Sequence, residues 1–215
     1  MVEQLRITEI FYSLQGEART VGCPTVFVRL TGCPLRCGYC DTEYAFSGGE
    51  LMTLSQVMDV VASFGATYVT VTGGEPLAQP GAIPLCTSLC DAGYEVSLET
   101  SGAIDVSMVD PRVVKVMDLK TPGSLEVDKN LLSNIDCLTE NDQVKFVICD
   151  REDYEWSKRQ LEKYALADKV SDVLFSPSFG QIEAKDLAEW VLADRLPVRF
   201  QLQLHKLLWA DAAGH

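Results

Sequence analysis

Short apolar runs recur along the 215-residue chain, and segments with helical periodicity separate most of them. The runs span residues 25–30, 68–72, 95–100, 113–119, 143–148, 172–175 and 199–204. Several are nearly continuous in Val, Ile, Leu and Phe, which is typical of parallel strands covered on both faces. Because strands alternate with helices, right-handed crossovers and one parallel sheet are favoured.

The clearest predicted helix spans residues 53–64. Thr53 and Gln56 have the spacing of a capping box, and Gly65 stands where a glycine often ends a helix. Further helices are predicted over 84–92, 152–165 and 184–193.

One connection is too short for a crossover helix, because only about a dozen residues separate the runs at 95–100 and 113–119. The sequence therefore predicts an α/β fold: a trimmed, partly open parallel (β/α) barrel with fewer helices than strands. In such sheets ligands bind at the carboxyl ends of the strands.

The bulk composition is that of one globular domain over residues 1–215. Hydrophobic residues make up 47% of the chain and charged residues 23%. The net charge of −13 disfavours direct binding of nucleic acid. The chain shows neither a signal-peptide pattern nor an apolar stretch of ~20 residues, so we expect a cytosolic protein with no membrane segment. In that reducing compartment, the eight cysteines favour metal binding or redox chemistry over disulfides.

A cysteine-rich loop follows the first core strand. Residues 32–42 read GCPLRCGYCDT and place Cys33, Cys37 and Cys40 in the pattern CxxxCxxC. Thiolates are the usual ligands of iron–sulfur clusters. Three thiolates would hold three irons of a four-iron cluster and leave the fourth iron open to a ligand, whereas a closed structural site uses four ligands. The sequence therefore predicts a reactive 4Fe-4S cluster.

Structural zinc is the alternative for this loop. Zinc needs a fourth ligand, and Cys23 is the nearest candidate because both histidines lie far away in the sequence. The other thiols favour core positions, since Cys86 and Cys90 share one face of a predicted helix, and Cys137 and Cys149 lie among apolar residues.

The cysteine spacing, with Tyr39 before the last cysteine, resembles the signature of the radical S-adenosylmethionine (SAM) superfamily. The run TGGEP at 72–76 resembles that superfamily's GGEP motif, which binds the SAM amino group. Gly73 and Gly74 let the main chain approach a ligand, and Glu75 offers an acceptor for an ammonium group. The resemblance implies that SAM is contacted by Gly73, Gly74, Glu75, Pro76, Ser101, Lys120, Lys145 and Ser176.

The chain is also similar to the 7-carboxy-7-deazaguanine synthase family from Ile7 to about Trp209. The similarity includes FYSLQGE at 11–17, FVRLTGC at 27–33 and DLKTP at 118–122. It implies conversion of 6-carboxy-5,6,7,8-tetrahydropterin to 7-carboxy-7-deazaguanine, by ring contraction with loss of ammonia, on the route to queuosine. By this resemblance, a flavodoxin-like donor reduces the cluster, SAM is cleaved to a 5′-deoxyadenosyl radical and later re-formed, and the enzyme is a homodimer.

Several residues suit a pterin substrate on chemical grounds. Glu17 can accept hydrogen bonds from a guanidine-like edge, Gln15 can both donate and accept, and Arg29 can hold a carboxylate with two parallel bonds. His205 is a candidate donor or lid residue. The predicted substrate site comprises Leu14, Gln15, Gly16, Glu17, Arg29, Thr72 and His205, and the predicted catalytic set comprises Cys33, Cys37, Cys40, Glu17 and Arg29.

Residues 1–24 are interpreted as an extension on the substrate side, and residues 199–215 as a C-terminal strand and tail. The family resemblance further implies Mg²⁺ bound by the Thr42 hydroxyl, with water and substrate oxygens as the other ligands.

Simpler explanations stay open at this point. In one of them, Glu17 and Arg29 pair with each other at a strand end. In another, Gln15 and Gly16 form only a turn. Two other function classes also remain: a glycyl-radical activating enzyme, whose substrate is a protein backbone, and a non-catalytic zinc or electron-carrying module.

Overall fold

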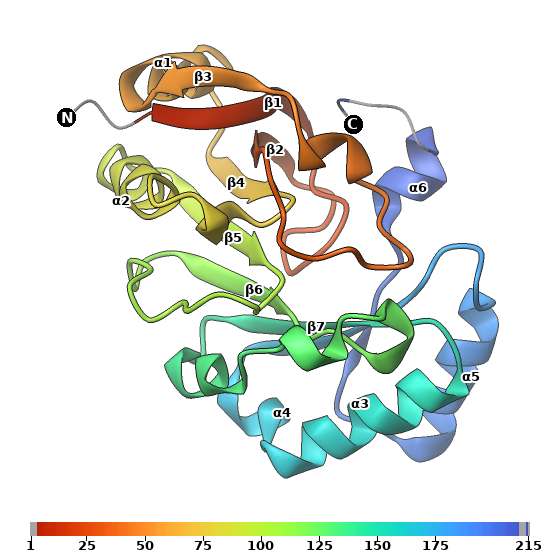
Figure 1. Cartoon of the computed structure of the whole chain (residues 1–215). Helices are drawn as coiled ribbons and strands as arrows, with labels where there is room; N and C mark the ends of the chain where they lie inside the picture. Colours follow the sequence, from red (N-terminus) through yellow and green to blue (C-terminus); the bar gives the residue numbers. More distant parts are fainter. Residues whose placement is uncertain (1–3, 211–213, 215) are drawn as a thin grey trace.

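The computed structural model describes residues 4–210 and residue 214. Strands form one sheet in the order β3-β1-β2-β4-β5-β6-β7-β8-β9, and the sheet does not close, because β3 and β9 are its edges (Figure 1). The partly open barrel is thereby confirmed.

The parallel part of the sheet consists of β2 (Pro24–Leu30), β4 (Tyr68–Gly73), β5 (Glu95–Thr100), β6 (Val114–Asp118), β7 (Gln143–Ile148), β8 (Asp172–Pro177) and β9 (Arg199–Phe200). Two strands that the sequence did not predict complete the sheet. β1 (Gln4–Leu14) runs antiparallel to both β2 and β3 (Glu50–Thr53). About half of the predicted N-terminal extension, residues 4–14 and Pro24, is therefore part of the sheet itself.

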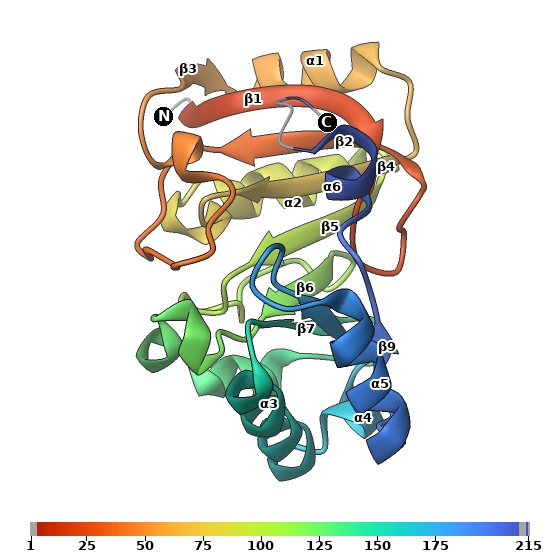
Figure 2. The same cartoon turned by 90° about the vertical axis from the view of Figure 1, so that its right-hand side faces the viewer.

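The helices lie on the outer side of the curved sheet, except for the last one (Figures 1 and 2). They are α1 (Leu54–Ser63), α2 (Ala82–Asp91), α3 (Arg151–Lys163), α4 (Leu166–Lys169), α5 (Ala184–Asp194) and α6 (Leu204–Trp209). The capping box of α1 is confirmed, because the Gln56 main-chain N–H donates to Thr53 Oγ1 at 3.2 Å and Thr53 N–H donates to Gln56 Oε1 at 2.8 Å. No helix occurs between β5 and β6, as predicted. None of the described helices has the length and apolarity that crossing a membrane requires.

Two apolar clusters hold the helices to the outer face of the sheet. The first packs strands β1 to β5 against α1 and α2, with Val28, Val71 and Leu98 among its buried members. The second packs β6, β7 and β8 against α3, α4 and α5, and in it the rings of Phe146 and Phe175 meet edge to face with centroids 5.4 Å apart. Such burial is the main source of stability for an α/β sheet.

The inner face of the sheet is polar, so the prediction of strands covered on both faces is wrong for this side. Successive residues of a strand point to opposite faces, and alternate positions on the inner side carry Thr70, Thr72, Glu99 and Lys145. These side chains surround a cavity instead of meeting a helix layer.

The predicted strand at 199–204 ends at Phe200, and Leu204 begins α6 instead. The reason lies in the loop after β1. Gln201 donates from Nε2 to Ala18 O and accepts from Ala18 N–H, and Leu204 N–H donates to Gly16 O at 2.9 Å. These bonds turn the chain away from β8. The rest of the predicted tail, residues 211–213 and 215, lies outside the described residues.

Candidate active site

A cavity of about 550 Å³ lies on the inner side of the sheet. Its walls come from the cysteine loop, the carboxyl ends of β4 to β7, residues 14–17 after β1, and α6. Figure 2 shows α6 on the side of the sheet opposite the helix layer. The cavity therefore brings together segments from the beginning, middle and end of the chain.

The three cysteines of the loop stand at one end of this cavity. Cys33, Cys37 and Cys40 are free thiols, partly exposed, and all three line the cavity wall. Burial raises the pKa of each thiol above its ordinary value, and the positive charge of Lys120 opposes that rise. A bound cationic metal centre would supply the charge that these thiols need to become thiolates.

The cysteine loop packs directly on the GGEP loop. Glu75 N–H donates to Gly32 O at 2.8 Å. A Cβ on Gly74 would lie 2.4 Å from Gly32 O and 2.6 Å from Cys33 Cβ, so only glycine allows this contact. Gly73 and Gly74 line the cavity next to the cysteines, which leaves their main chain available to a ligand.

The side chain of Glu75, predicted to bind the SAM ammonium group, accepts its hydrogen bonds from the protein itself in this structure. Its carboxylate is fully buried outside the cavity wall and accepts from Leu77 N–H, from the Thr100 hydroxyl, and from both the N–H and hydroxyl of Ser101, at 2.6–3.1 Å. An ammonium group would have to displace these donors. Glu75 thereby ties the GGEP loop to the end of β5.

Two more of the predicted SAM contacts lie outside the cavity. Pro76 is buried at the start of a 3₁₀ turn, and Ser176 donates its hydroxyl to Gln201 O at 2.8 Å. Ser101, Lys120 and Lys145 do line the cavity. Sequence position alone could not distinguish residues that line the cavity from residues that do not, because all of them lie on or directly after strands.

A series of paired, largely buried acidic and basic side chains lines the cavity. Lys145 Nζ lies 2.5 Å from Glu17 Oε2 and 3.7 Å from Asp118 Oδ2, and Lys120 Nζ lies 2.9 Å from the same Asp118 oxygen. Gln203 Nε2 donates to the other oxygen of Glu17 at 2.6 Å. Burial alone would raise the pKa of Glu17, but the Lys145 charge and these hydrogen bonds hold it below its ordinary value.

Glu99 also lines the cavity, and its pKa is shifted in the direction opposite to that of Glu17. Burial raises the pKa of Glu99; Lys145 opposes the rise, and the negative charge of Glu17 adds to it. Two neighbouring carboxyls thus have pKa values pushed in opposite directions, which is a common mark of acid–base sites. The sequence prediction missed Glu99, although its position one residue before the end of β5 and its inward register were readable signals.

Arg29 does not pair with Glu17, so that simpler explanation is excluded. Its partner is Glu9 on β1, with Arg29 Nε 2.7 Å from Glu9 Oε1. Gln15 does serve the local turn, because its side chain donates to Thr70 Oγ1 and accepts from Glu17 N–H. Leu14, Gln15, Gly16 and Thr72 nevertheless line the cavity.

Helix α6 connects both ends of the cavity. Its His205 lies against Gly16, where an added Cβ would be 2.2 Å from His205 Nδ1. At the cysteine end, Asp41 Oδ2 lies 4.0 Å from His205 Nε2 and 3.4 Å from Lys206 Nζ, while Thr42 donates its hydroxyl to Asp41 Oδ1 at 2.8 Å. Burial would raise the pKa of Asp41, but the donors His205 and Thr42 and the Lys206 charge hold it well below its usual range.

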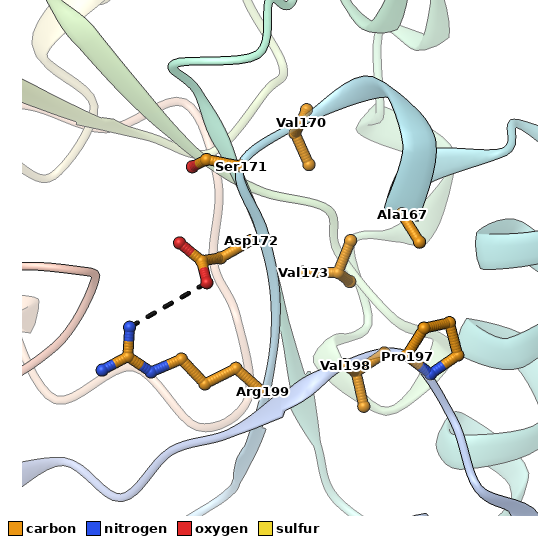
Figure 3. A pocket seen from close by; sticks show the side chains of 8 residues that line it. All are labelled: Ala167, Val170, Ser171, Asp172, Val173, Pro197, Val198 and Arg199. Atoms are coloured by element: carbon orange, nitrogen blue, oxygen red, sulfur yellow. Dashed lines mark ion pairs between the residues drawn. The ribbon is translucent and has the colours of Figure 1, made fainter.

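A second hollow lies at the amino ends of β8 and β9 (Figure 3). Apolar side chains form one wall of it, and on the other Asp172 Oδ1 lies 3.9 Å from Arg199 Nη1. Asp172 also pairs with Arg19 Nε at 3.1 Å. The one carboxylate here is thus already paired, and the hollow is at the end of the strands opposite the cysteines.

Comparison with known proteins identifies the enzyme class of this chain. Residues 27–170 match the model of the Radical SAM superfamily. The chain therefore belongs to the radical SAM enzymes, which use a 4Fe-4S cluster and SAM. Within that class it belongs to the 7-carboxy-7-deazaguanine synthase family, because relatives of that name match it over nearly their whole length.

Two such relatives illustrate the match. The 7-carboxy-7-deazaguanine synthase of Chlorobaculum tepidum is 47% identical over 98% of this chain and 97% of its own, and that of Koribacter versatilis is 42% identical over 95% and 97%. The crystal structure of QueE from Escherichia coli superposes with a TM-score of 0.76 at 25% identity and covers 94% of this chain and 95% of that one.

The residues present fit the two cofactors. Three thiols around one opening are the donor set that a 4Fe-4S cluster with an open iron requires. Next to them, Gly73 and Gly74 line the same cavity, as do Ser101 and Lys120. Structural zinc is excluded, because members of the assigned family bind a 4Fe-4S cluster.

Proposed function

We propose that this chain converts 6-carboxy-5,6,7,8-tetrahydropterin to 7-carboxy-7-deazaguanine, with loss of ammonia. One observation carries the proposal: a single cavity joins the three thiols to a polar end lined by Glu17, Arg29, Glu99 and His205. Its volume of about 550 Å³ is in the usual range for small-molecule sites. The name shared by the relatives supports the same product.

At the cysteine end, the protein's task is to hold the cofactors. Cys33, Cys37 and Cys40 would bind the cluster, the main chain of Gly73 and Gly74 would accept from the SAM ammonium group, and Lys120 would face its carboxylate. When bound, the cluster and SAM supply the radical chemistry, while the protein positions the substrate and keeps water out.

At the polar end, Glu17 and Arg29 would recognise the pterin from two sides. Glu17 carries a negative charge stabilised by Lys145 and Gln203, so it can accept from the N–H groups of the pterin edge. Arg29 has the geometry for the substrate carboxylate. His205 and α6 close this end over the substrate, which shields the reacting ring from water.

Glu99 is the candidate for proton handling during the loss of ammonia. The leaving nitrogen must gain protons, and a carboxyl group whose pKa is raised by burial holds a proton closer to neutral pH than an ordinary glutamic acid. The charges of Lys145 and Arg29 both oppose the rise in the pKa of Glu99, so its protonation would respond to a substrate carboxylate bound by Arg29.

Mg²⁺ bound by Thr42 is a further part of the proposal. Thr42 lines the cavity, and its hydroxyl already donates to Asp41, which leaves an oxygen lone pair for a metal. Mg²⁺ keeps much of its water shell, so one protein oxygen together with the substrate carboxylate is a reasonable ligand set.

We also place the chain in the cytosol, as a single domain over residues 1–215 that works as a homodimer with a flavodoxin-like electron donor. Reduced thiols are stable in that compartment, and reductive cleavage of SAM would need one electron from an external donor.

Anaerobic turnover tests the proposal. The reconstituted protein is incubated with dithionite, SAM, Mg²⁺ and 6-carboxy-5,6,7,8-tetrahydropterin, and the products are followed by ultraviolet absorbance and mass spectrometry. The expected product is lighter by one ammonia and forms over many turnovers with little net loss of SAM. Cleavage of SAM with the pterin untouched would contradict the proposed substrate and point to a protein glycine instead.

A further inference from the structure

Arg29 is held in place by two residues that have no assigned role. Glu9 Oε1 accepts from Arg29 Nε at 2.7 Å and also from the Tyr44 hydroxyl at 2.8 Å. The Arg29 and Glu9 side chains are only 14% and 21% exposed, so the pair is largely protected from solvent screening. One carboxylate oxygen thus binds both an arginine and a tyrosine from different elements.

Two aromatic rings lie next to the guanidinium group. Its central carbon lies 5.6 Å from the centroid of the Phe11 ring and 5.7 Å from that of Tyr44. The Phe11 ring is itself stacked on Phe27, with centroids 4.9 Å apart. Cation–π contacts of this kind add to the hydrogen bond in fixing the plane of the arginine.

These contacts occupy only one edge of the guanidinium group. Glu9 takes Nε, and within the described part of the chain Nη1 and Nη2 donate to no protein acceptor. Arg29 lines the cavity, so the free pair of terminal nitrogens is available there. Two parallel N–H groups are what a carboxylate binds in a bidentate manner.

A backbone irregularity aims Glu9 at this position. The register of β1 against β2 shifts between Ile7 and Glu9, and after the shift Glu9 stands directly opposite Arg29. Without the bulge, Ile7 and Glu9 would share a face, yet Ile7 packs in the outer apolar cluster while Glu9 lies on the inner side. Bulges near active sites often redirect a side chain in this way.

Tyr44 links this arrangement to the cysteine loop. It lies in a 3₁₀ turn, Glu43–Phe46, that follows the last cysteine of the loop after only a few residues. The loop that would hold the cluster therefore also supplies the hydroxyl that fixes Glu9.

We propose that Glu9 and Tyr44 are positioning residues that hold Arg29 ready for the substrate carboxylate and so create the preference for a carboxylated pterin. This inference rests on the proposed function. The alternative is a plain cross-strand ion pair that stabilises the sheet and has no influence on ligand choice.

The experiment compares two ligands in the reconstituted full-length protein. Anaerobic calorimetry measures Kd for 6-carboxy-5,6,7,8-tetrahydropterin and for tetrahydropterin, which lacks the carboxylate, in wild type, Glu9→Gln and Tyr44→Phe. Freeing one long side chain costs roughly 0.5–1.5 kcal/mol on binding, so Glu9→Gln should weaken binding of the carboxylated ligand about two- to twelvefold and leave binding of the other unchanged. Tyr44→Phe keeps the ring and should give a smaller loss.

Asp172→Asn is the matched control. Asp172 accepts from Arg19 Nε at 3.1 Å, so this variant removes one charge from a similar Nε–carboxylate pair far from the cavity. It should leave both Kd values unchanged. Thermal melting of all variants checks folding, and the Arg29→Ala background checks the mechanism, because Glu9→Gln should have no further effect on binding once Arg29 is absent.

The outcomes separate the two proposals. A wild type that binds both ligands equally overturns the proposed substrate and this inference with it. A wild type that prefers the carboxylated ligand, together with a Glu9→Gln variant that keeps the full preference or weakens both ligands equally, overturns the positioning role alone.

Discussion

The two faces of the same strands have opposite properties. On the outer face, side chains such as Val71, Leu98 and Phe146 are fully buried against helices. On the inner face, one residue away in each strand, stand Thr72, Glu99 and Lys145. Because side chains alternate along a strand, one stretch of sequence carries both the packing that holds the sheet and the groups that would act on a substrate.

Substitutions on the two faces should affect different properties of the protein. Outer positions contribute to stability through buried apolar area, and removing them leaves cavities. Inner positions hold charges that are costly to bury and are balanced only by each other, an arrangement that proteins keep at functional sites. Substitutions on the two faces should therefore separate stability from activity.

The largest effect is expected at the cysteine end of the cavity. Cys37→Ala should reduce turnover to background, because a thiolate ligand of the cluster is lost, while the melting temperature of the cluster-free protein stays close to that of wild type. Turnover, iron and sulfide content, and thermal melting measure these quantities. A variant that retains turnover would break the assignment of this thiol.

Phe146→Ala tests the outer face at the position next to Lys145. Its ring is fully buried between Phe175 and Trp156. The substitution should lower the free energy of unfolding by about 3–5 kcal/mol. Urea denaturation measures this loss, and the variant that remains folded should keep its affinity for the pterin. A loss below 1 kcal/mol would contradict the outer-face packing.

Glu17→Gln tests the balance of charges on the inner face. Lys145 would keep its charge but lose its closest partner, so the free energy of unfolding should fall by roughly 1–3 kcal/mol. Adding Lys145→Met to Glu17→Gln should recover much of the lost free energy of unfolding, because no unpaired charge stays buried. Turnover should not return, since the site would then lack both groups. Denaturation of the two single variants and the double variant gives the coupling. Additive effects would show that the pair is not energetically linked.

Glu99→Gln should have the smallest effect on stability, and the effect should depend on pH. The reference pKa of the side chain is 4.5, and burial raises it in the folded chain. The folded protein then holds the proton to higher pH, so the free energy of unfolding falls as pH rises from the unfolded pKa through the folded one. Glutamine does not titrate there.

The melting temperature of Glu99→Gln should therefore exceed that of wild type increasingly as pH rises above about 4.5, and the two should coincide below it. Thermal melting across pH measures the difference. A gap that is constant with pH would show that burial of the charge is not its cause.

Local patterns were enough to predict much of this molecule. The inner strands, the capped helix after Thr53 and the cysteine and glycine loops are each encoded within a few consecutive residues, so the sequence predicts them directly. The open barrel followed from one connection that is too short for a helix. Glu17 and Arg29 were identified by chemistry and resemblance, and both line the cavity.

Other features depend on contacts between distant segments. Glu9 was missed because β1 was not predicted as a strand, and a period-two pattern would in any case have given Glu9 the same face as Ile7. The hydrogen bonds that Glu75 accepts from Thr100 and Ser101 could not be predicted, because these donors lie on a different strand end. The strand predicted at 199–204 proved shorter and α6 was missed, because Leu204 is fixed by a hydrogen bond to Gly16, near the other end of the sequence.

That last contact has a consequence for how the molecule is made. Chains emerge from the ribosome with the N-terminus first. The segment Gln203–Lys206, which binds Glu17, Gly16 and Asp41, is therefore synthesised long after the three cysteines. Until it docks, the cavity lacks the wall that α6 supplies, so the site is complete only after the last helix of the chain has been made.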